Sequence, residues 1–191
     1  MAVVVFDFDG TLLRGDSTKL IFKLLTSNKV WFIYYYYLIH FFGIMVYLFS
    51  GNDLRLMESR RKYLMRNSHK ITPKFSAKLK RYLFQNVVTR MEYYLDKGYK
   101  CVIISAGFKE IINIILRNEQ INVFASSIYE ELKVRLNFER KVDIINKFSL
   151  AEDESLIAFG NSAGDMPMLR IAKQAFWVDE QGEISEFGGD V

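Results

Sequence analysis

The 191-residue sequence predicts an α/β fold, in which a parallel β-sheet is flanked by helices and an all-helical cap is inserted after the first strand. Two observations support this prediction. Short, apolar, β-branched runs alternate with segments of helical periodicity at the start of the chain and from residue 87 onward. The intervening residues 17–86 contain no convincing strand and enough helical sequence for three to five helices.

Five short runs have the composition of buried parallel strands. They are Ala2–Phe6, Tyr99–Ile104, Asn122–Ala125, Leu156–Phe159 and Ala175–Val178. Helices are expected at Val87–Lys97, Lys109–Arg117, Arg140–Phe148 and Met166–Lys173. This alternation implies right-handed crossovers and a Rossmann-like sheet of about five strands. We therefore expect an α/β core formed by residues 1–16 and 87–191, with residues 17–86 as the inserted cap.

Composition excludes several classes of protein. Half of the residues are hydrophobic and a quarter are charged, so the chain is not generally disordered. A single cysteine, Cys101, cannot form an internal disulfide, and one cysteine with two histidines is too few for a structural zinc site. The N-terminal apolar run meets Asp7 and Asp9 at once, which no secretory signal tolerates. We expect a cytoplasmic location.

The strongest chemical signal is the run Asp7-Phe8-Asp9-Gly10-Thr11-Leu12, directly after the first strand. Ligands of open α/β sheets bind at the carboxyl ends of the strands. At that edge one carboxylate of a pair can act as a nucleophile while the other moves a proton, or the two can share a cation. Gly10 and Thr11 allow a tight turn whose N–H groups face the site. A plain Asp- and Gly-rich turn is the simpler interpretation of this run taken alone.

Three further elements favour a functional site. The second strand ends in Ser105-Ala106-Gly107, where a hydroxyl and backbone N–H groups can hold a phosphoryl oxygen. Lys141 begins a helix, a position where a lysine is ordinarily a solvated charge. In the run 159–169, Asn161 and Asp165 offer hard oxygen ligands for Mg²⁺ beside Asp7, although the same run also suits a helix N-terminus.

These four elements, in this order and across nearly the whole chain, resemble the haloacid dehalogenase-like hydrolase superfamily. The helical insertion resembles its phosphoserine-phosphatase-like branch, often called subfamily IB. The resemblance implies a Mg²⁺-dependent phosphatase with a phospho-aspartate intermediate on Asp7. It implies that Asp9 protonates the leaving alcohol and then activates water, that Ser105 binds phosphoryl oxygens, and that Lys141 neutralises charge.

The resemblance also implies a Mg²⁺ ion held by Asp7, the backbone carbonyl of Asp9 and the last motif. In that motif the family usually has aspartate where this chain has Asn161. An amide oxygen can ligate Mg²⁺ but brings no charge, so we expect weaker metal binding or a larger share of the coordination for Asp165. Loss of catalysis is the alternative, although Asp7, Asp9 and Asp165 are all present.

The segment Val30–Ser50 has 21 residues, of which ten are aromatic and none is Asp, Glu, Lys or Arg. Because motifs on both sides of it must meet, a single membrane crossing is excluded. The segment is then either the interior or dimer interface of the cap, or an aromatic face in the headgroup zone of a membrane. Residues 51–100 carry thirteen basic and four acidic residues, net +9, including Arg60, Arg61 and Lys62. Such a basic segment suits anionic lipid, with residues 30–66 on the inner face of the membrane.

The apolar insertion resembles that of the phosphatidylglycerophosphatase C family, which implies a lipid phosphate as substrate. The competing substrate is a small phosphomonoester such as phosphoserine, because Asp16 stands where phosphoserine phosphatases carry an acidic residue that contacts the substrate amine. Asp16 with Ser17 is also a good helix N-cap. A nucleic-acid-binding protein is not expected, since Asp7 and Asp9 would repel a phosphate backbone. A membrane scaffold without catalysis and a phosphotransferase remain alternatives, and the oligomeric state is left open.

Overall fold

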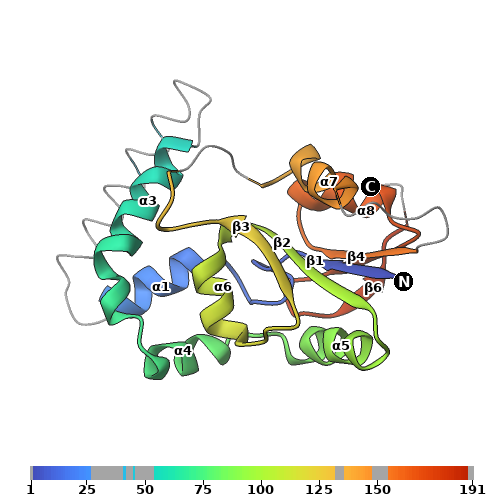
Figure 1. The fold of residues 1–191 in the computed structure, drawn as a ribbon, viewed down its shortest axis with the longest axis horizontal. Helices are drawn as coiled ribbons and strands as arrows, with labels where there is room; N and C mark the ends of the chain where they lie inside the picture. The colour runs from blue at the N-terminus through green and yellow to red at the C-terminus, as the bar shows by residue number, and fades with distance from the viewer. Residues whose placement is uncertain are drawn as a thin grey trace.

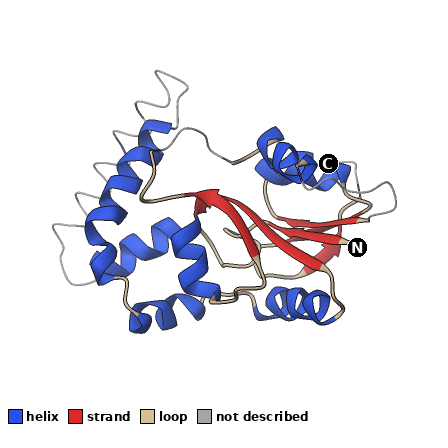
Figure 2. Cartoon of the chain, in the orientation of Figure 1, coloured by secondary structure: helices blue, strands red, loops and turns tan. Residues whose placement is uncertain are grey.

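The computed structural model of the chain describes residues 2–26, 41, 45, 54–131, 136–147 and 155–188. Within these ranges six strands form one sheet, in the order β3, β2, β1, β4, β5, β6 (Figures 1 and 2). The first five strands run parallel to one another, which confirms the predicted α/β fold. The strands are β1 (Val3–Phe6), β2 (Lys100–Phe108), β3 (Asn122–Ser126), β4 (Leu156–Gly160), β5 (Gln174–Val178) and β6 (Ile184–Glu186).

Two features of the sheet differ from the expectation. Strand β6 was not predicted, and it pairs antiparallel with β5 at the edge of the sheet. The turn before it is held by Asp179, whose side chain accepts hydrogen bonds from the N–H groups of Gln181 (2.9 Å) and Glu183 (2.8 Å). Strand β2 does not end before Ser105 but continues to Phe108, past a register shift in its pairing with β3.

Alternate residues of the central strand pack on opposite faces of the sheet, as the period of a strand requires. Val4 and Phe6 belong to the larger apolar cluster, together with residues of α5 (Gln85–Asp96) and α6 (Lys109–Leu116). Val3 and Val5 belong to a second cluster with α7 (Glu139–Asn146) and α8 (Met166–Ile171). Helices therefore cover both faces of the sheet, as Figure 1 shows for α5 on one side and α7 and α8 on the other.

An aromatic row crosses three neighbouring strands on one face of the sheet. Phe6 of β1 stacks on Phe159 of β4 with ring centroids 4.6 Å apart, and Phe159 stacks on Phe176 of β5 at 4.7 Å. These residues are direct partners in the strand register. Stacked rings in register fix the alignment of β1 with β4, and the functional motifs follow directly after these two strands.

The described part of residues 17–86 is helical, apart from turns and short connecting segments. It contains α1 (Ser17–Thr26), α3 (Leu54–Asn67), the short 3₁₀ helix η1 (Ser68–Lys70) and α4 (Pro73–Lys80). The two chain segments that join these helices to the sheet run side by side. Arg14 donates its N–H to the carbonyl of Tyr82 (2.7 Å), and Phe84 donates to that of Leu12 (2.9 Å). These paired connections are compatible with the proposed division of the chain into an α/β core and a helical cap.

Most of the aromatic segment Val30–Ser50 lies outside the described residues, with Phe41 and Met45 as the exceptions. Phe41 is exposed and Met45 is partly exposed. Among the helices that are described, none combines the length and the apolar character that a membrane crossing needs. The two expectations for this segment, a cap interior or a membrane contact, both remain predictions.

Candidate active site

The candidate site lies where the strand order of the sheet reverses. Strand β1 is central, with β2 on one side and β4 on the other. Asp7 follows β1, Ser105 lies toward the carboxyl end of β2, and Asn161 follows β4. Open α/β sheets bind ligands at this kind of switch point, because loops from neighbouring strands diverge there and leave a crevice.

Lys141 connects the first and last motifs. Its Nζ donates to Oδ1 of Asp7 at 2.5 Å and to Oδ1 of Asp165 at 2.6 Å, across 134 and 24 residues of sequence. Lys141 is 2% exposed, so it is one of the rare buried lysines. Burial alone would lower its pKa, but the charges of Asp7 and Asp165 outweigh burial and raise the pKa. The ammonium group is therefore fixed in its charged form between two carboxylates.

Asp165 is held by its own loop as well as by Lys141. Its Oδ2 accepts hydrogen bonds from Ser162 Oγ (2.7 Å) and from the N–H groups of Ser162 (3.0 Å) and Asn161 (3.1 Å). Both carboxylate oxygens of Asp165 are thus engaged by donors of the protein. This arrangement favours a role in orienting Lys141 over the larger share of metal coordination that the sequence led us to expect.

Gly10, Thr11 and Asn161 form a compact support beside these acidic groups. Thr11 is fully buried, and its Oγ1 donates to Oδ1 of Asn161 at 3.1 Å. Gly10 has φ of +87°, and a Cβ built there would lie 2.1 Å from Nδ2 of Asn161. Only glycine meets both requirements without strain. In this structure Gly10 and Thr11 shape the position of Asn161, and their expected contact with substrate stays a prediction.

Asp9 is bound by the first residue of α1. Its Oδ1 accepts from the N–H of Ser17 at 2.8 Å, and its Oδ2 from Ser17 Oγ at 3.2 Å. Burial of the carboxyl group, with repulsion from Asp16 and Asp7, raises the pKa of Asp9 to about 8. Burial also raises the pKa of Asp7 to about 7, although Lys141 opposes this shift. Asp9 is therefore protonated at neutral pH, the form that a general acid requires.

Asp16 has two partners on different elements. Its Oδ1 accepts from the N–H of Lys19 at 2.9 Å, so it caps α1. Its Oδ2 lies 3.7 Å from Nη1 of Arg60 on α3. Asp16 therefore both caps α1 and lies at the candidate site, two roles that the sequence offered as alternatives.

These elements line a cavity of about 320 Å³. Four carboxyl groups face two cationic side chains on its walls: Asp7, Asp9, Asp16 and Asp165 against Arg60 and Lys141. Ser105, Ala106 and Gly107 form another wall, and the Ser105 hydroxyl accepts a hydrogen bond from the N–H of Gly107 at 3.1 Å. With Asp9 protonated, three carboxyl groups face the two cationic side chains, and the negative charge that remains when Asp7 is ionised makes a cation the natural complement of this cavity.

The oxygen donors at this site fit a Mg²⁺ ion. Among the described residues, no three carboxylate, histidine or cysteine side chains gather closely enough to ligate one ion. Asp7 and Asp9 line the cavity and offer a carboxylate and a backbone carbonyl, whereas Asn161, the third expected donor, is not among the lining residues and its amide oxygen accepts a hydrogen bond from the hydroxyl of Thr11. All three are hard oxygens, the ligands that Mg²⁺ prefers, and Mg²⁺ commonly keeps several waters in place of further protein ligands.

Several lining residues were not expected from the sequence. Met57 and Arg60 come from α3, Thr18 from α1, and Asn137 and Phe138 from the segment before α7. The one available signal was that Met57 and Arg60 are three residues apart, which places them on one side of a helix. Phe138 has a positive φ of 49° and donates its N–H to the carbonyl of Gly164 at 2.9 Å. This contact ties the start of the Lys141 helix to the Asp165 loop.

The expected basic surface at residues 60–62 is corrected by the structure. The Arg61 residue is 8% exposed and the Arg60 side chain is 13% exposed, whereas that of Lys62 is 59% exposed. Arg60 faces the cavity and lies 3.7 Å from Asp16, and Arg61 packs inward between Glu58 and the carbonyl of Ile128. Lys62 also lies 3.7 Å from Glu58, but from an exposed position. Of the three, only Lys62 contributes to the outer surface, while Arg60 can meet an anion inside the cavity.

The fold and site define a hydrolase of the haloacid dehalogenase type. A family model for haloacid dehalogenase-like hydrolases matches residues 4–170, so the chain belongs to this family. The predicted resemblance to this family is confirmed. A search of curated proteins found no match.

Solved structures share the fold at low sequence identity. The chain is similar to a protein of unknown function from Bordetella pertussis Tohama I, with a TM-score of 0.63 and 16% identity over 91% of this chain and 88% of that one. It is similar to a substrate-bound phosphoserine phosphatase, with a TM-score of 0.59 and 18% identity over 91% and 84%. It is also similar to a phosphoserine phosphohydrolase-like protein from Francisella tularensis subsp. tularensis SCHU S4, with a TM-score of 0.58 and 19% identity over 92% of this chain and 86% of that one.

The raised pKa values of Asp7 and Asp9 predict how the stability of the metal-free protein depends on pH. Both groups bind a proton more tightly in the folded state than in the unfolded state, where the pKa is near 3.8. The free energy of unfolding should therefore fall as pH rises from about 5 to about 8.5, by at least about 2 kcal/mol. Urea denaturation in EDTA measures it. The double variant Asp7→Asn/Asp9→Asn should lose most of this dependence, and an unchanged slope would contradict the assignment.

Proposed function

We propose that the protein is a Mg²⁺-dependent phosphomonoester hydrolase that acts through a phosphorylated Asp7. The observation that carries the proposal is the buried bridge from Lys141 to Asp7 and Asp165 on the wall of an acidic cavity. A carboxylate fixed beside a permanent cation, at the switch point of the sheet, is suited to attack phosphorus. A solved structure of a phosphoserine phosphatase with a phospho-aspartyl intermediate analogue has the same fold, with a TM-score of 0.53.

In the first half of the reaction, a carboxylate oxygen of Asp7 forms a bond to phosphorus while the bond from phosphorus to the ester oxygen breaks. Asp9 is protonated at neutral pH, and it delivers its proton to the departing alcohol. Ser105 and the N–H groups near Gly107 hold the phosphoryl oxygens, and Lys141 offsets their charge. The products of this half are the free alcohol and phospho-Asp7.

In the second half, Asp9 is ionised and takes a proton from a water molecule that attacks phosphorus. The bond from phosphorus to Asp7 then breaks, which returns the carboxylate and releases inorganic phosphate. Ser17 keeps the Asp9 carboxyl in place through both halves, since it binds both oxygens. Asp7, the carbonyl of Asp9 and Asn161 would hold a Mg²⁺ ion, which would offset the negative charge of the carboxylate and the phosphate.

The variant Asn161→Asp should bind Mg²⁺ more tightly, because it adds a negative charge at a proposed ligand. Thr11 can donate its hydroxyl to a carboxylate as well as to an amide, so the side chain should keep its orientation. We expect the Mg²⁺ dissociation constant to fall about tenfold. Calorimetric titration of Mg²⁺ into the wild type and the variant, without substrate, measures this directly. Equal or weaker binding by the variant would remove Asn161 from the ligand set.

For the substrate, we propose a phosphomonoester whose alcohol part carries an anionic group near Arg60. Arg60 lines the cavity and is the one arginine that does so among the described residues. The anionic group could belong to the headgroup of a lipid, such as the phosphodiester of phosphatidylglycerophosphate, or to a small acid such as phosphoserine. We favour the lipid because the cap is aromatic at 30–50 and bears exposed basic side chains such as Lys62 and Lys78.

The proposed function is tested with a substrate panel. Mg²⁺-dependent release of phosphate from p-nitrophenyl phosphate tests the hydrolase, and absence of release at any Mg²⁺ concentration would refute it. Phosphoserine and phosphatidylglycerophosphate in vesicles are then compared. Preference for the vesicle substrate, with vesicle binding that weakens as salt rises, supports the lipid. Preference for phosphoserine, without vesicle binding, transfers the assignment to the phosphoserine-phosphatase-like alternative.

A further inference from the structure

We infer that Arg61 is a positioning residue that holds helix α3 over the active-site cavity. The inference rests on the proposed function, because it concerns the same cavity. Arg61 is on α3, next to the two α3 residues that line the cavity, Met57 and Arg60. The guanidinium group of Arg61 points away from the cavity, because it donates to the backbone carbonyl of Ile128, in the core segment that follows β3.

Arg61 is buried, and all three of its guanidinium nitrogens donate hydrogen bonds. Nε donates to Oε2 of Glu58 at 2.7 Å, and Nη2 donates to Oε1 of Glu58 at 2.6 Å. This two-pronged pair fixes the plane of the guanidinium group. The remaining nitrogen, Nη1, donates to the backbone carbonyl of Ile128 at 3.0 Å. Arg61 thus reaches across 67 residues of sequence from the cap to the core.

The core side of this contact is itself anchored. Oε2 of Glu110 accepts from the N–H of Ile128 at 3.0 Å, and Oε1 of Glu110 accepts from Ser127 Oγ at 2.6 Å. Glu110 is in the first turn of α6, directly after β2 and its phosphate-binding candidates Ser105 and Gly107. We call the five residues Glu58, Arg61, Glu110, Ser127 and Ile128 the cap–core seam. The seam connects α3 to the element that follows the phosphate-binding wall.

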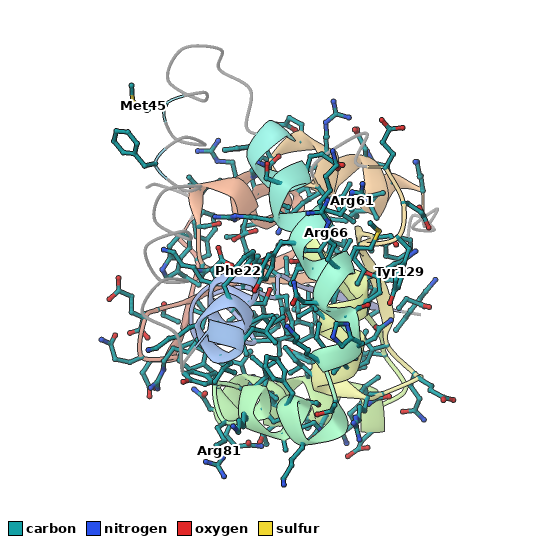
Figure 3. The ribbon with its side chains drawn as sticks, turned by 90° about the vertical axis from the view of Figure 1, so that its left-hand side faces the viewer. Phe22, Met45, Arg61, Arg66, Arg81 and Tyr129 are labelled. Atoms are coloured by element: carbon teal, nitrogen blue, oxygen red, sulfur yellow. The ribbon has the colours of Figure 1, made fainter. Side chains whose placement is uncertain are left out.

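Two rows of residues on α3 therefore have different tasks. Met57 and Arg60 are three residues apart and line the cavity, while Glu58 and Arg61 are also three apart and face the seam. In a third contact, Tyr63 of α3 stacks on Phe22 of α1, with ring centroids 4.3 Å apart. Figure 3 looks onto α3, with Phe22 on one side of the helix and Tyr129, next to Ile128, on the other.

The stack with Phe22 joins α3 to α1, whose first residue, Ser17, is bound to Asp9 of the core, so this stack fixes α3 against the core only indirectly. The cap–core seam fixes α3 against the core directly. Arg61 donates to the carbonyl of Ile128, and the N–H of Ile128 is itself bound to Glu110.

Asp7, Ser105 and Lys141 form the floor of the cavity on the core side. Loss of the seam should leave this floor intact but let Met57 and Arg60 shift. Because small misplacements of binding groups reduce rates strongly, such a shift should affect substrates that extend under α3.

The test compares Arg61→Met with Arg66→Met, which removes an exposed arginine from the same helix. For Arg61→Met, kcat/KM for p-nitrophenyl phosphate should fall about tenfold. The affinity for beryllofluoride with Mg²⁺, a phosphoryl analogue small enough to bind at Asp7 alone, should stay within about twofold of wild type. Hydrogen exchange of the α3 amides should become faster, while exchange in β1 stays unchanged. Arg66→Met should match the wild type in all three measurements.

Unchanged α3 exchange and unchanged kcat/KM in Arg61→Met would overturn the inference. An equal loss of beryllofluoride affinity would also overturn it, because the effect would then reach the floor of the cavity. Arg61→Lys keeps the charge without the two-pronged geometry, should give intermediate values, and serves if the methionine variant does not fold. If the wild type hydrolyses no phosphomonoester, the proposed function fails, whereas the exchange measurement still decides whether Arg61 holds α3.

Discussion

Asp7→Asn should reduce Mg²⁺-dependent phosphatase turnover by at least about three orders of magnitude. The amide is nearly the same size as the carboxylate and can still accept the hydrogen bond from Lys141 through its oxygen. It cannot act as the nucleophile, so no covalent intermediate forms. The substitution also removes a buried group whose pKa is raised to about 7, so the metal-free variant should be at least as stable as the wild type at pH 8.

Stopped assays at saturating substrate measure this loss, and thermal unfolding in EDTA shows that the variant is folded. Asp143→Asn is the matched control, because Asp143 is an exposed aspartate on α7, the helix that carries Lys141. The control should keep wild-type turnover. Wild-type turnover by the Asp7 variant would remove Asp7 as the nucleophile.

Lys141→Met should reduce both activity and stability. Without the ammonium group, Asp7 and Asp165 remain buried close to each other with no cation between them. Removal of one partner from a buried ion pair typically costs about 3–5 kcal/mol. Turnover should fall by about 10²–10³, since a fixed positive charge at the transferring group is lost.

The loss of stability should depend on pH in a defined direction. The pKa of Asp7 should rise further when Lys141 is absent, so protonation at about pH 5.5 should recover part of the stability lost at pH 8. Urea denaturation at the two pH values measures this difference. Lys147→Met, which removes an exposed lysine at the end of the same helix, should show neither effect. Wild-type stability of Lys141→Met at pH 8 would contradict the buried bridge.

The sequence was sufficient for the architecture because the central strands β1 and β4 are fully buried and β2 nearly so. A parallel strand with helices on both faces needs apolar residues at successive positions, as in Val3–Phe6, and such runs are easy to identify. Strand β6 escaped prediction because it is a short, mostly exposed edge strand. The extension of β2 to Phe108 escaped because Ser105-Ala106-Gly107 is typical of turns, and pairing with β3 resumes only at Phe108, after a register shift.

The sequence predicted the part of the site that is made of local motifs, but not the part that depends on tertiary contacts. Asp7, Asp9 and Asp165 belong to local motifs, and the cavity brings them together with Ser105 and Lys141. The role of Arg60 depends on Asp16, and that of Arg61 on Glu58 and on the distant carbonyl of Ile128. A count of basic residues treats both as surface charge, whereas Asp16 and Glu58 draw them inward. Charge composition therefore predicts the sign of a segment but not which side chains remain exposed.

Chemical trapping of the intermediate tests the account most directly. The enzyme is mixed with Mg²⁺ and substrate, quenched in acid and reduced with borohydride, which converts an aspartyl phosphate to homoserine. Peptide mass spectrometry should then find homoserine at position 7 and at no other aspartate, and no homoserine when Mg²⁺ is omitted. Full turnover with no modified residue at position 7, or with the modification at Asp9, would contradict the assignment of Asp7.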